Sequence, residues 1–178
     1  MAETKTVCFT GHREILSADA SALRKRLDLV LNALYTLGYR HFISGGALGF
    51  DLLAAEEVIA LRAEHTDVRL EFAIPFPRQC AAWPKAEQVR YEKLLYRADK
   101  ISPLAPHYFH GAYLQRNRYM VDRSAVCIAY FNGSPTGGTS FTACYALRKD
   151  LRVINIFDDE ITAEGLRTLL TEQAKTAL

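Results

Sequence analysis

Apolar positions along the chain fall into two alternating patterns. Short continuous apolar runs are typical of buried strands. Between them lie longer segments in which apolar residues recur every three or four positions, as on one face of a helix. The runs predicted as strands are 6–10, 40–44, 68–74, 100–102, 125–131 and 152–157. This alternation predicts an α/β fold, with a mostly parallel sheet and helices on both faces.

The predicted helices follow the strands in turn. The clearest has Ser17 or Asp19 as its N-cap and Gly38 at its end. Its apolar face consists of Leu23, Leu27, Val30, Leu31, Leu34 and Leu37. The other predicted helices are 50–64, 85–96, 113–123, 139–149 and 162–174. Their apolar candidates include Val89, Leu94, Leu95, Leu166, Leu169 and Leu170. The irregular stretch 103–111 is predicted to be a mobile loop that covers the binding site formed by the glycine-rich loops described next.

Three glycine-rich loops each follow a predicted strand and precede a predicted helix. They read Thr10-Gly11-His12-Arg13, then Ser44-Gly45-Gly46-Ala47-Leu48-Gly49-Phe50-Asp51, then Ser134-Pro135-Thr136-Gly137-Gly138-Thr139. Loops at the carboxyl ends of parallel strands gather along one edge of the sheet. Glycine lets backbone N–H groups approach a phosphate, and the start of a helix favours negative charge. The loops therefore predict one composite site for a phosphorylated small molecule.

Composition limits the classes of protein and of partner. The 178 residues are expected to form a single domain, 1–178, and the net charge of +2 comes from 22 basic and 20 acidic residues. Because a marked basic excess is missing, we do not expect a nucleic-acid partner. Cys8, Cys80, Cys127 and Cys144 have no metal-ligand spacing, so we expect structural thiols and no metal. No apolar run approaches about 18 residues and no signal peptide is visible, which predicts a cytoplasmic protein without a membrane partner.

The loop residues suggest specific contacts, each with a plainer alternative. Ser44, Gly45 and Gly46, and likewise Gly137, Gly138 and Thr139, either cradle a phosphate or form tight turns. Arg13 either pairs with a phosphate or forms a surface ion pair. Asp51 either accepts ribose hydroxyls or caps a helix. His12 orients the ligand, acts as an acid or base, or satisfies loop hydrogen bonds.

Together with their neighbours, these loops resemble a known family. The matching motifs are Cys8-Phe9-Thr10-Gly11-His12-Arg13, the segment 44–51, Pro75-Phe76 with Gln79 and Trp83, Arg116-Asn117-Arg118-Tyr119-Met120-Val121-Asp122 and Gly137-Gly138-Thr139. They are similar, over about 7–155, to the YpsA-type branch of the SLOG superfamily, which includes DprA and the LOG phosphoribohydrolases. The resemblance implies a Rossmann-like fold and a pocket for a nucleotide or nucleotide-derived ligand. Arg116 and Asn117 either contact that ligand or brace the loops. Trp83 either stacks on a base or packs in the core.

The resemblance leaves the chemistry open. LOG enzymes carry a motif of the form PGGxGTxxE, and the position of its glutamate falls here on Thr142. Threonine is no general acid or base, so we expect a nucleotide-binding sensor or regulatory module that requires no cofactor. An ADP-ribose-like molecule is among the candidate ligands. The alternatives are a nucleotide-processing hydrolase that uses His12 or Asp51, and a DprA-like protein associated with single-stranded DNA. Dimers are frequent in the superfamily, and a homodimer is compatible with this sequence.

Overall fold

The structure is a computed structural model, which describes residues 5–158, 161, 165, 166 and 168. Within this part of the chain, six strands form one sheet in the order β4-β3-β2-β1-β5-β6, and all neighbouring strands are parallel. The elements are β1 (Thr6–Gly11), α1 (Ser17–Thr36), β2 (His41–Ser44), α2 (Phe50–Glu64), β3 (Arg69–Ile74), α3 (Lys85–Tyr96), β4 (Lys100–Pro103), α4 (Ala112–Val121), β5 (Val126–Tyr130), α5 (Gly138–Arg148) and β6 (Arg152–Asn155).

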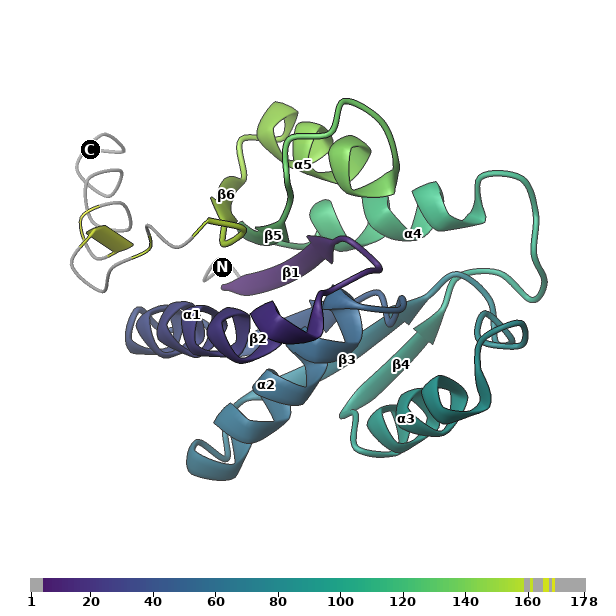
Figure 1. Ribbon diagram of the computed structural model, residues 1–178, viewed down its shortest axis with the longest axis horizontal. Coiled ribbons are helices and arrows are strands. Elements are labelled where there is room, and N and C mark those ends of the chain that lie inside the picture. Colours follow the sequence, from purple (N-terminus) through teal and green to yellow (C-terminus); the bar gives the residue numbers. More distant parts are fainter. Residues whose placement is uncertain (1–4, 159–160, 162–164, 167, 169–178) are drawn as a thin grey trace.

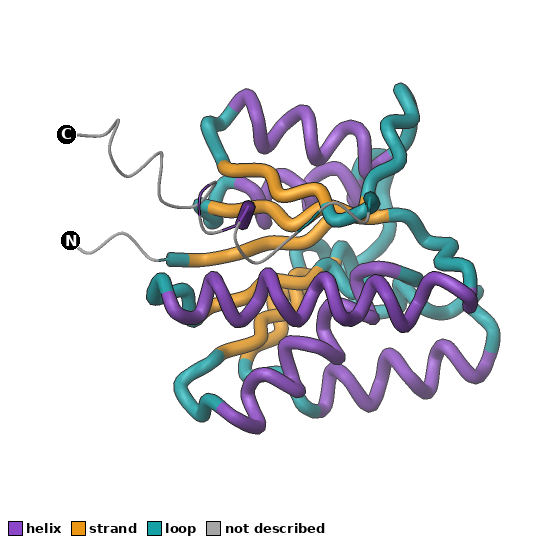
Figure 2. Tube along the Cα trace, turned by 60° about the vertical axis from the view of Figure 1, so that its left-hand side comes forward, coloured by secondary structure: helices purple, strands orange, loops and turns teal. Residues whose placement is uncertain are grey.

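The sheet lies between two layers of helices. Helices α1, α2 and α3 cover one face, and α4 and α5 lie on the other (Figure 1). A turned view shows the strands as a central layer with helices on either side (Figure 2). The predicted Rossmann-like α/β fold is therefore confirmed, and the sheet is entirely parallel among the described strands.

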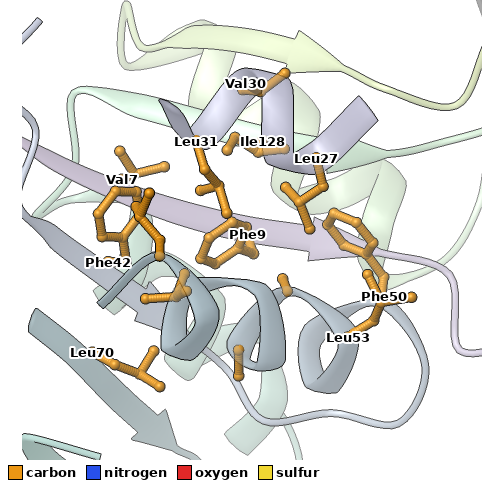
Figure 3. Close-up of a cluster of buried hydrophobic side chains, with 14 of the residues drawn as sticks. Val7, Phe9, Leu27, Val30, Leu31, Phe42, Phe50, Leu53, Leu70 and Ile128 are labelled. Atoms are coloured by element: carbon orange, nitrogen blue, oxygen red, sulfur yellow. The ribbon is translucent and has the colours of Figure 1, made fainter. Parts of the chain in front are cut away.

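The larger core fills the space between the sheet and the layer of α1 and α2. Leu27 and Leu31 of α1 point toward Phe9 of β1 (Figure 3), and Val30 is buried in the same cluster, as their helical spacing predicts. The ring of Phe9 in β1 lies 6.4 Å from that of Phe42 in β2. Successive side chains of a strand point to opposite faces. A second apolar cluster therefore forms under α4 and α5, from Cys8, Ile43, Ala73, Met120, Val121, Cys127 and Ala146.

A buried carboxylate interrupts this second face of the sheet. Glu71 of β3 is 1% exposed and lies 3.0 Å from His41 Nε2 and 3.2 Å from Lys100 Nζ. It also accepts hydrogen bonds from the hydroxyls of Ser102 (2.8 Å) and Tyr119 (3.0 Å). Burial raises the pKa of Glu71, but the hydrogen bonds outweigh it and lower the pKa to about 2. The carboxylate thus stays ionised and ties β2, β4 and α4 to β3.

The order of the strands places the candidate site. From β1 the chain builds outward through β2, β3 and β4, and α4 then returns it to the other side of β1, where β5 and β6 follow. The direction of winding therefore reverses between β1 and β5. In open α/β sheets, ligands bind outside the carboxyl ends of the strands at such a switch point.

Some local predictions differ from the structure. Helix α1 begins at Ser17 with Leu16 as its N-cap and no side-chain cap hydrogen bond, so neither Ser17 nor Asp19 caps it. Val89 is 37% exposed, whereas Tyr91 is buried, because α3 turns that side chain toward the sheet. The predicted helix 162–174 lies mostly outside the described residues, although Leu166 is described and is buried. The cysteines are free thiols, and Cys8 and Cys127 are buried as predicted.

Candidate functional site

A cleft of about 320 Å³ opens at the switch point between β1 and β5. Its walls come from the first and third glycine loops, Ala47 of the second loop, the start of α2 and one face of α4. Most of the predicted site residues line it, namely Thr10, Gly11, His12, Arg13, Asp51, Arg116, Asn117, Gly137, Gly138 and Thr139. The structure therefore brings together residues that are far apart in the sequence, in a volume within the usual range for small-molecule sites.

Backbone contacts hold the first loop against the second. The N–H of Phe50 donates to the carbonyl of His12 at 3.1 Å. Gly49 has a φ of +80°, and a Cβ at this position would overlap the backbone of Arg13. Only glycine accommodates both the left-handed backbone and this close approach. The first residue of α2 and the Arg13 backbone are thus fixed relative to each other.

His12 joins the first loop to the third. The backbone N–H of His12 donates to the Tyr130 carbonyl at 3.2 Å. The ring nitrogen Nε2 accepts the backbone N–H of Asn132 at 3.0 Å. Because Nε2 accepts a hydrogen bond, the proton of the neutral ring lies on Nδ1. The ring also packs edge-on against Tyr130 and Phe157. These contacts favour the alternative in which His12 satisfies loop hydrogen bonds, since Nε2 is not free for acid or base chemistry.

The glycines of the second loop hold residues of the cleft in place and do not line it themselves. Ser44, Gly45 and Gly46 are buried and are not among the residues that line the cleft. The Ser44 hydroxyl donates to the Asp51 carbonyl at 3.0 Å and accepts the Gly46 N–H at 3.1 Å. The Gly45 carbonyl accepts a hydrogen bond from Arg116 Nη1. The predicted direct contact of Ser44, Gly45 and Gly46 with a phosphate therefore has no support in the geometry.

Two buried charges form the floor of the cleft. Asp51 and Arg116 are each 5% exposed. Asp51 Oδ2 accepts the Ala47 N–H at 3.3 Å, and Arg116 Nε donates to Asn117 Oδ1 at 2.7 Å. Burial raises the pKa of Asp51, and the charge of Arg116 opposes that rise. Burial likewise lowers the pKa of Arg116, and Asp51 opposes it. Each charge thus partly compensates the desolvation of the other.

The start of α5 forms the opposite wall. Gly137 precedes the helix with a φ of +102°, and among the described residues no side chain caps the helix N-terminus. The first N–H groups of an uncapped helix lack intrahelical partners and favour an anion. Gly138 and Thr139 place these groups at the cleft, which Arg13 and Arg116 also line.

The position that corresponds to the LOG glutamate lies away from the cleft. Thr142 is fully buried, and its hydroxyl donates to the Gly138 carbonyl at 2.7 Å. Among the described residues that line the cleft, Asp51 supplies the only carboxylate. The described residues that line the cleft therefore do not include the pair of carboxylic acids that is typical of glycoside cleavage.

Sequence reasoning missed part of the cleft, above all Tyr113. This residue lies in the first turn of α4, three positions before Arg116, so both occupy one helix face. That spacing was a usable signal. Phe9, Ala47, Met120 and Thr136 also line the cleft; each lies within one of the motifs, but none was predicted as a site residue. Trp83 does not line it; its ring packs edge-on against Tyr91 at 5.3 Å, which favours the packing alternative.

Two further features bear on possible partners. Within the described residues, no group of three or more His, Cys, Asp or Glu side chains is placed to hold a metal ion. Likewise, no helix in this part of the chain combines the length and the apolar character needed to cross a bilayer. The cytoplasmic location stays a prediction.

An all-parallel α/β sheet with a polar cleft at its switch point defines a Rossmann-like protein. The family model YpsA, described as the YspA SLOG family, matches residues 8–161, so the chain belongs to this family. It is 33% identical over 128 residues to the uncharacterized SPbeta prophage-derived protein YoqJ of Bacillus subtilis, covering 65% of this chain and 75% of YoqJ. It is 28% identical over 150 residues to the UPF0398 protein BH1768 of Halalkalibacterium halodurans, covering 80% and 79%.

Solved structures share the fold at low sequence identity. DprA from Streptococcus pneumoniae superimposes with a TM-score of 0.58 at 16% identity, over 94% of this chain and 56% of that one. This chain thus spans little more than half of the pneumococcal protein. The structure of TM1055 gives a TM-score of 0.52 at 16% identity, over 84% and 72%. The structure of DprA from Helicobacter pylori, which is reported with its single-stranded DNA binding mode, gives a TM-score of 0.51 at 18% identity. The match covers 96% of this chain and 82% of that one.

Proposed function

We propose that this protein binds a nucleotide or nucleotide-derived ligand in the cleft between β1 and β5 and acts as a sensor or regulatory module. The observation that carries the proposal is the convergence of the uncapped start of α5 with two arginines and one carboxylate in a single cleft. Such donors can bind a phosphate, and such an acceptor can bind ribose hydroxyls.

The phosphate would lie at Gly138 and Thr139. Backbone N–H groups at the start of α5 favour an anion, and Arg13 and Arg116 add positive charge near them. Arg116 is already held by the Gly45 carbonyl and Asn117, so it contributes a fixed charge. Arg13 is exposed and can move to meet the phosphate. This division gives the site one preorganised cation and one adaptable cation.

The sugar would lie near Asp51. A carboxylate at the floor of the cleft can accept hydrogen bonds from ribose hydroxyls, as the acidic residue of dinucleotide sites does. Desolvation disfavours the charged form of Asp51, and bound hydroxyl donors would favour it again. With Thr142 buried and His12 Nε2 engaged, the geometry supports binding better than bond cleavage.

Isothermal titration against AMP, ADP, ADP-ribose and NAD tests the proposal. Gly138→Asp places a carboxylate at the anion position; because a Cβ there meets only Asn117 Nδ2 at 3.9 Å, this variant should fold. We expect it to weaken binding by about tenfold or more. Gly138→Ala controls for the added Cβ, and Ser17→Asp adds the same charge at the start of α1, outside the cleft. The proposal fails if none of the four ligands binds, or if Gly138→Asp binds like the wild type.

A second candidate is association with single-stranded DNA. It is favoured by the shared fold of the Helicobacter pylori DprA, which weakens our expectation that nucleic acid is not a partner. Fluorescence anisotropy with a labelled oligothymidine at 50 and 200 mM salt tests it. DNA held through its phosphates loses affinity steeply with salt. Absent or salt-insensitive binding would remove this candidate and leave nucleotide binding untouched.

A further inference from the structure

One wall of the cleft is aromatic, which neither a phosphate nor a ribose requires. Tyr113 lines the cleft from the first turn of α4 and is half-buried. Arg116 and Asn117 follow it by three and four positions, so the ring and the polar groups lie on one face of the helix. The cleft therefore presents an aromatic surface beside its charged groups.

Two further rings hold Tyr113 in place. The Phe76 ring lies 5.8 Å from that of Tyr113 at an interplanar angle of 70°. The Tyr108 ring lies 6.4 Å from Tyr113 and 5.7 Å from Phe76. Phe76 follows β3 and Tyr108 follows β4, so the loops after two strands support this ring. Aromatic edges and faces attract at these distances, which orients the ring of Tyr113.

A planar cation already lies over the Tyr113 ring. The guanidinium carbon of Arg13 is 5.9 Å from the ring centroid, and Arg13 also lines the cleft. This ring face is thus reachable by a group inside the cleft. Stacked aromatic rings have centroids about 4.5–7 Å apart, so a nucleobase would occupy the same place as the guanidinium. Arg13 is exposed, so its long side chain can move away from the ring when a base binds there.

We infer that Tyr113 is the stacking platform for the base of the ligand, so that the cleft selects phosphates that carry a planar base over sugar phosphates. The inference rests on the proposed nucleotide binding. In the free protein, Arg13 covers the ring. When a base stacks on Tyr113, the guanidinium moves off the ring and is released to pair with the phosphate of the same ligand. Base recognition and phosphate recognition are thereby coupled through one side chain.

Titration of the wild type with AMP, GMP, CMP and UMP, each compared with ribose 5-phosphate, tests this inference. Stacking on one aromatic side chain typically changes affinity about 5- to 150-fold. We expect the preferred nucleotide to bind at least about tenfold tighter than ribose 5-phosphate. Tyr113→Ala should abolish this difference while keeping the affinity for ribose 5-phosphate, and Tyr113→Phe should retain it.

Tyr145→Ala is the matched control. This tyrosine is also half-buried, but it lies on α5 outside the cleft and donates to Asp122 at 2.9 Å. It should bind all five ligands like the wild type. The inference is overturned if the wild type binds ribose 5-phosphate as tightly as every nucleotide, or if Tyr113→Ala keeps the preference; in both cases the phosphate site itself survives. If none of the five compounds binds, the proposed function fails together with the inference.

Discussion

Replacing Gly45 with alanine is the sharpest test of how the floor of the cleft is built. A Cβ at this position would overlap the guanidinium of Arg116 and lie 2.7 Å from Asp51 Oδ2. Both side chains are buried, so neither can move into water without opening the cleft. The backbone of Gly45 has no positive φ that would exclude alanine. The expected damage is therefore purely one of space.

Two contributions set the size of the effect. Overpacking a buried site typically costs about 1–3 kcal/mol. Displacing Arg116 from the Gly45 carbonyl removes a hydrogen bond to a charged group, which is worth about 1.5–3 kcal/mol. We therefore expect Gly45→Ala to lower the free energy of unfolding by about 2.5–6 kcal/mol, which corresponds to roughly 5–24 °C in Tm for a chain of this size.

Urea denaturation and thermal melting followed by circular dichroism measure this difference. Gly138→Ala is the matched control, because its Cβ meets only Asn117 Nδ2 at 3.9 Å. It should leave stability unchanged or raise it by up to about 1 kcal/mol, since alanine restricts the unfolded chain. If the free energy of unfolding of Gly45→Ala lies within about 0.5 kcal/mol of the wild-type value, the Gly45 carbonyl does not hold Arg116 as described.

The remaining predictions concern stability elsewhere. The folded pKa of Glu71, about 2, lies below its ordinary 4.5, so acidification between these values protonates the unfolded chain first. The stability from this group, about 2–3 kcal/mol, is present above pH 4.5 and is lost toward pH 2. Acid titration of Glu71→Gln should show a flatter dependence; an unchanged slope contradicts this. Gly49→Ala should melt earlier and weaken AMP binding, because its Cβ collides with the Arg13 backbone at a φ of +80°; wild-type binding would show that this contact is dispensable. Leu27→Ala should cost about 2–5 kcal/mol in urea denaturation, and Leu147→Ala, 60% exposed, little; equal losses would refute the assigned core.

The fold was predictable because its signals are local and periodic. The face of α1 that carries Leu23, Leu27 and Leu31 is buried as its spacing predicts, and helix 50–64 has the predicted bounds. Errors occurred where local signals compete. Ser17 is a good capping residue by type, yet the helix starts at it, and packing decided that Tyr91 rather than Val89 faces the sheet.

The candidate site was predictable only in part. The glycine loops could be located in the sequence because glycine between a strand and a helix is a strong local signal. The separate roles of the loops could not be predicted from the sequence. By residue type, Ser44, Gly45 and Gly46 are as suited to binding a phosphate as Gly137 and Gly138 are. The order of the strands separates them, because only the loops after β1 and β5 flank the switch point.

By itself, the sequence determined the alternation of strands and helices, the positions of the glycine loops and the absence of a glutamate at Thr142, because these depend on residue type and short spacing. The tertiary structure alone decided that Asp51 and Arg116 share a buried floor and that Tyr113, supported by Phe76 and Tyr108, supplies the aromatic wall. Asp51 lies on α2, Arg116 and Tyr113 lie on α4, and Phe76 and Tyr108 lie in the loops after β3 and β4, so only the winding of the chain around one sheet brings them to the same cleft.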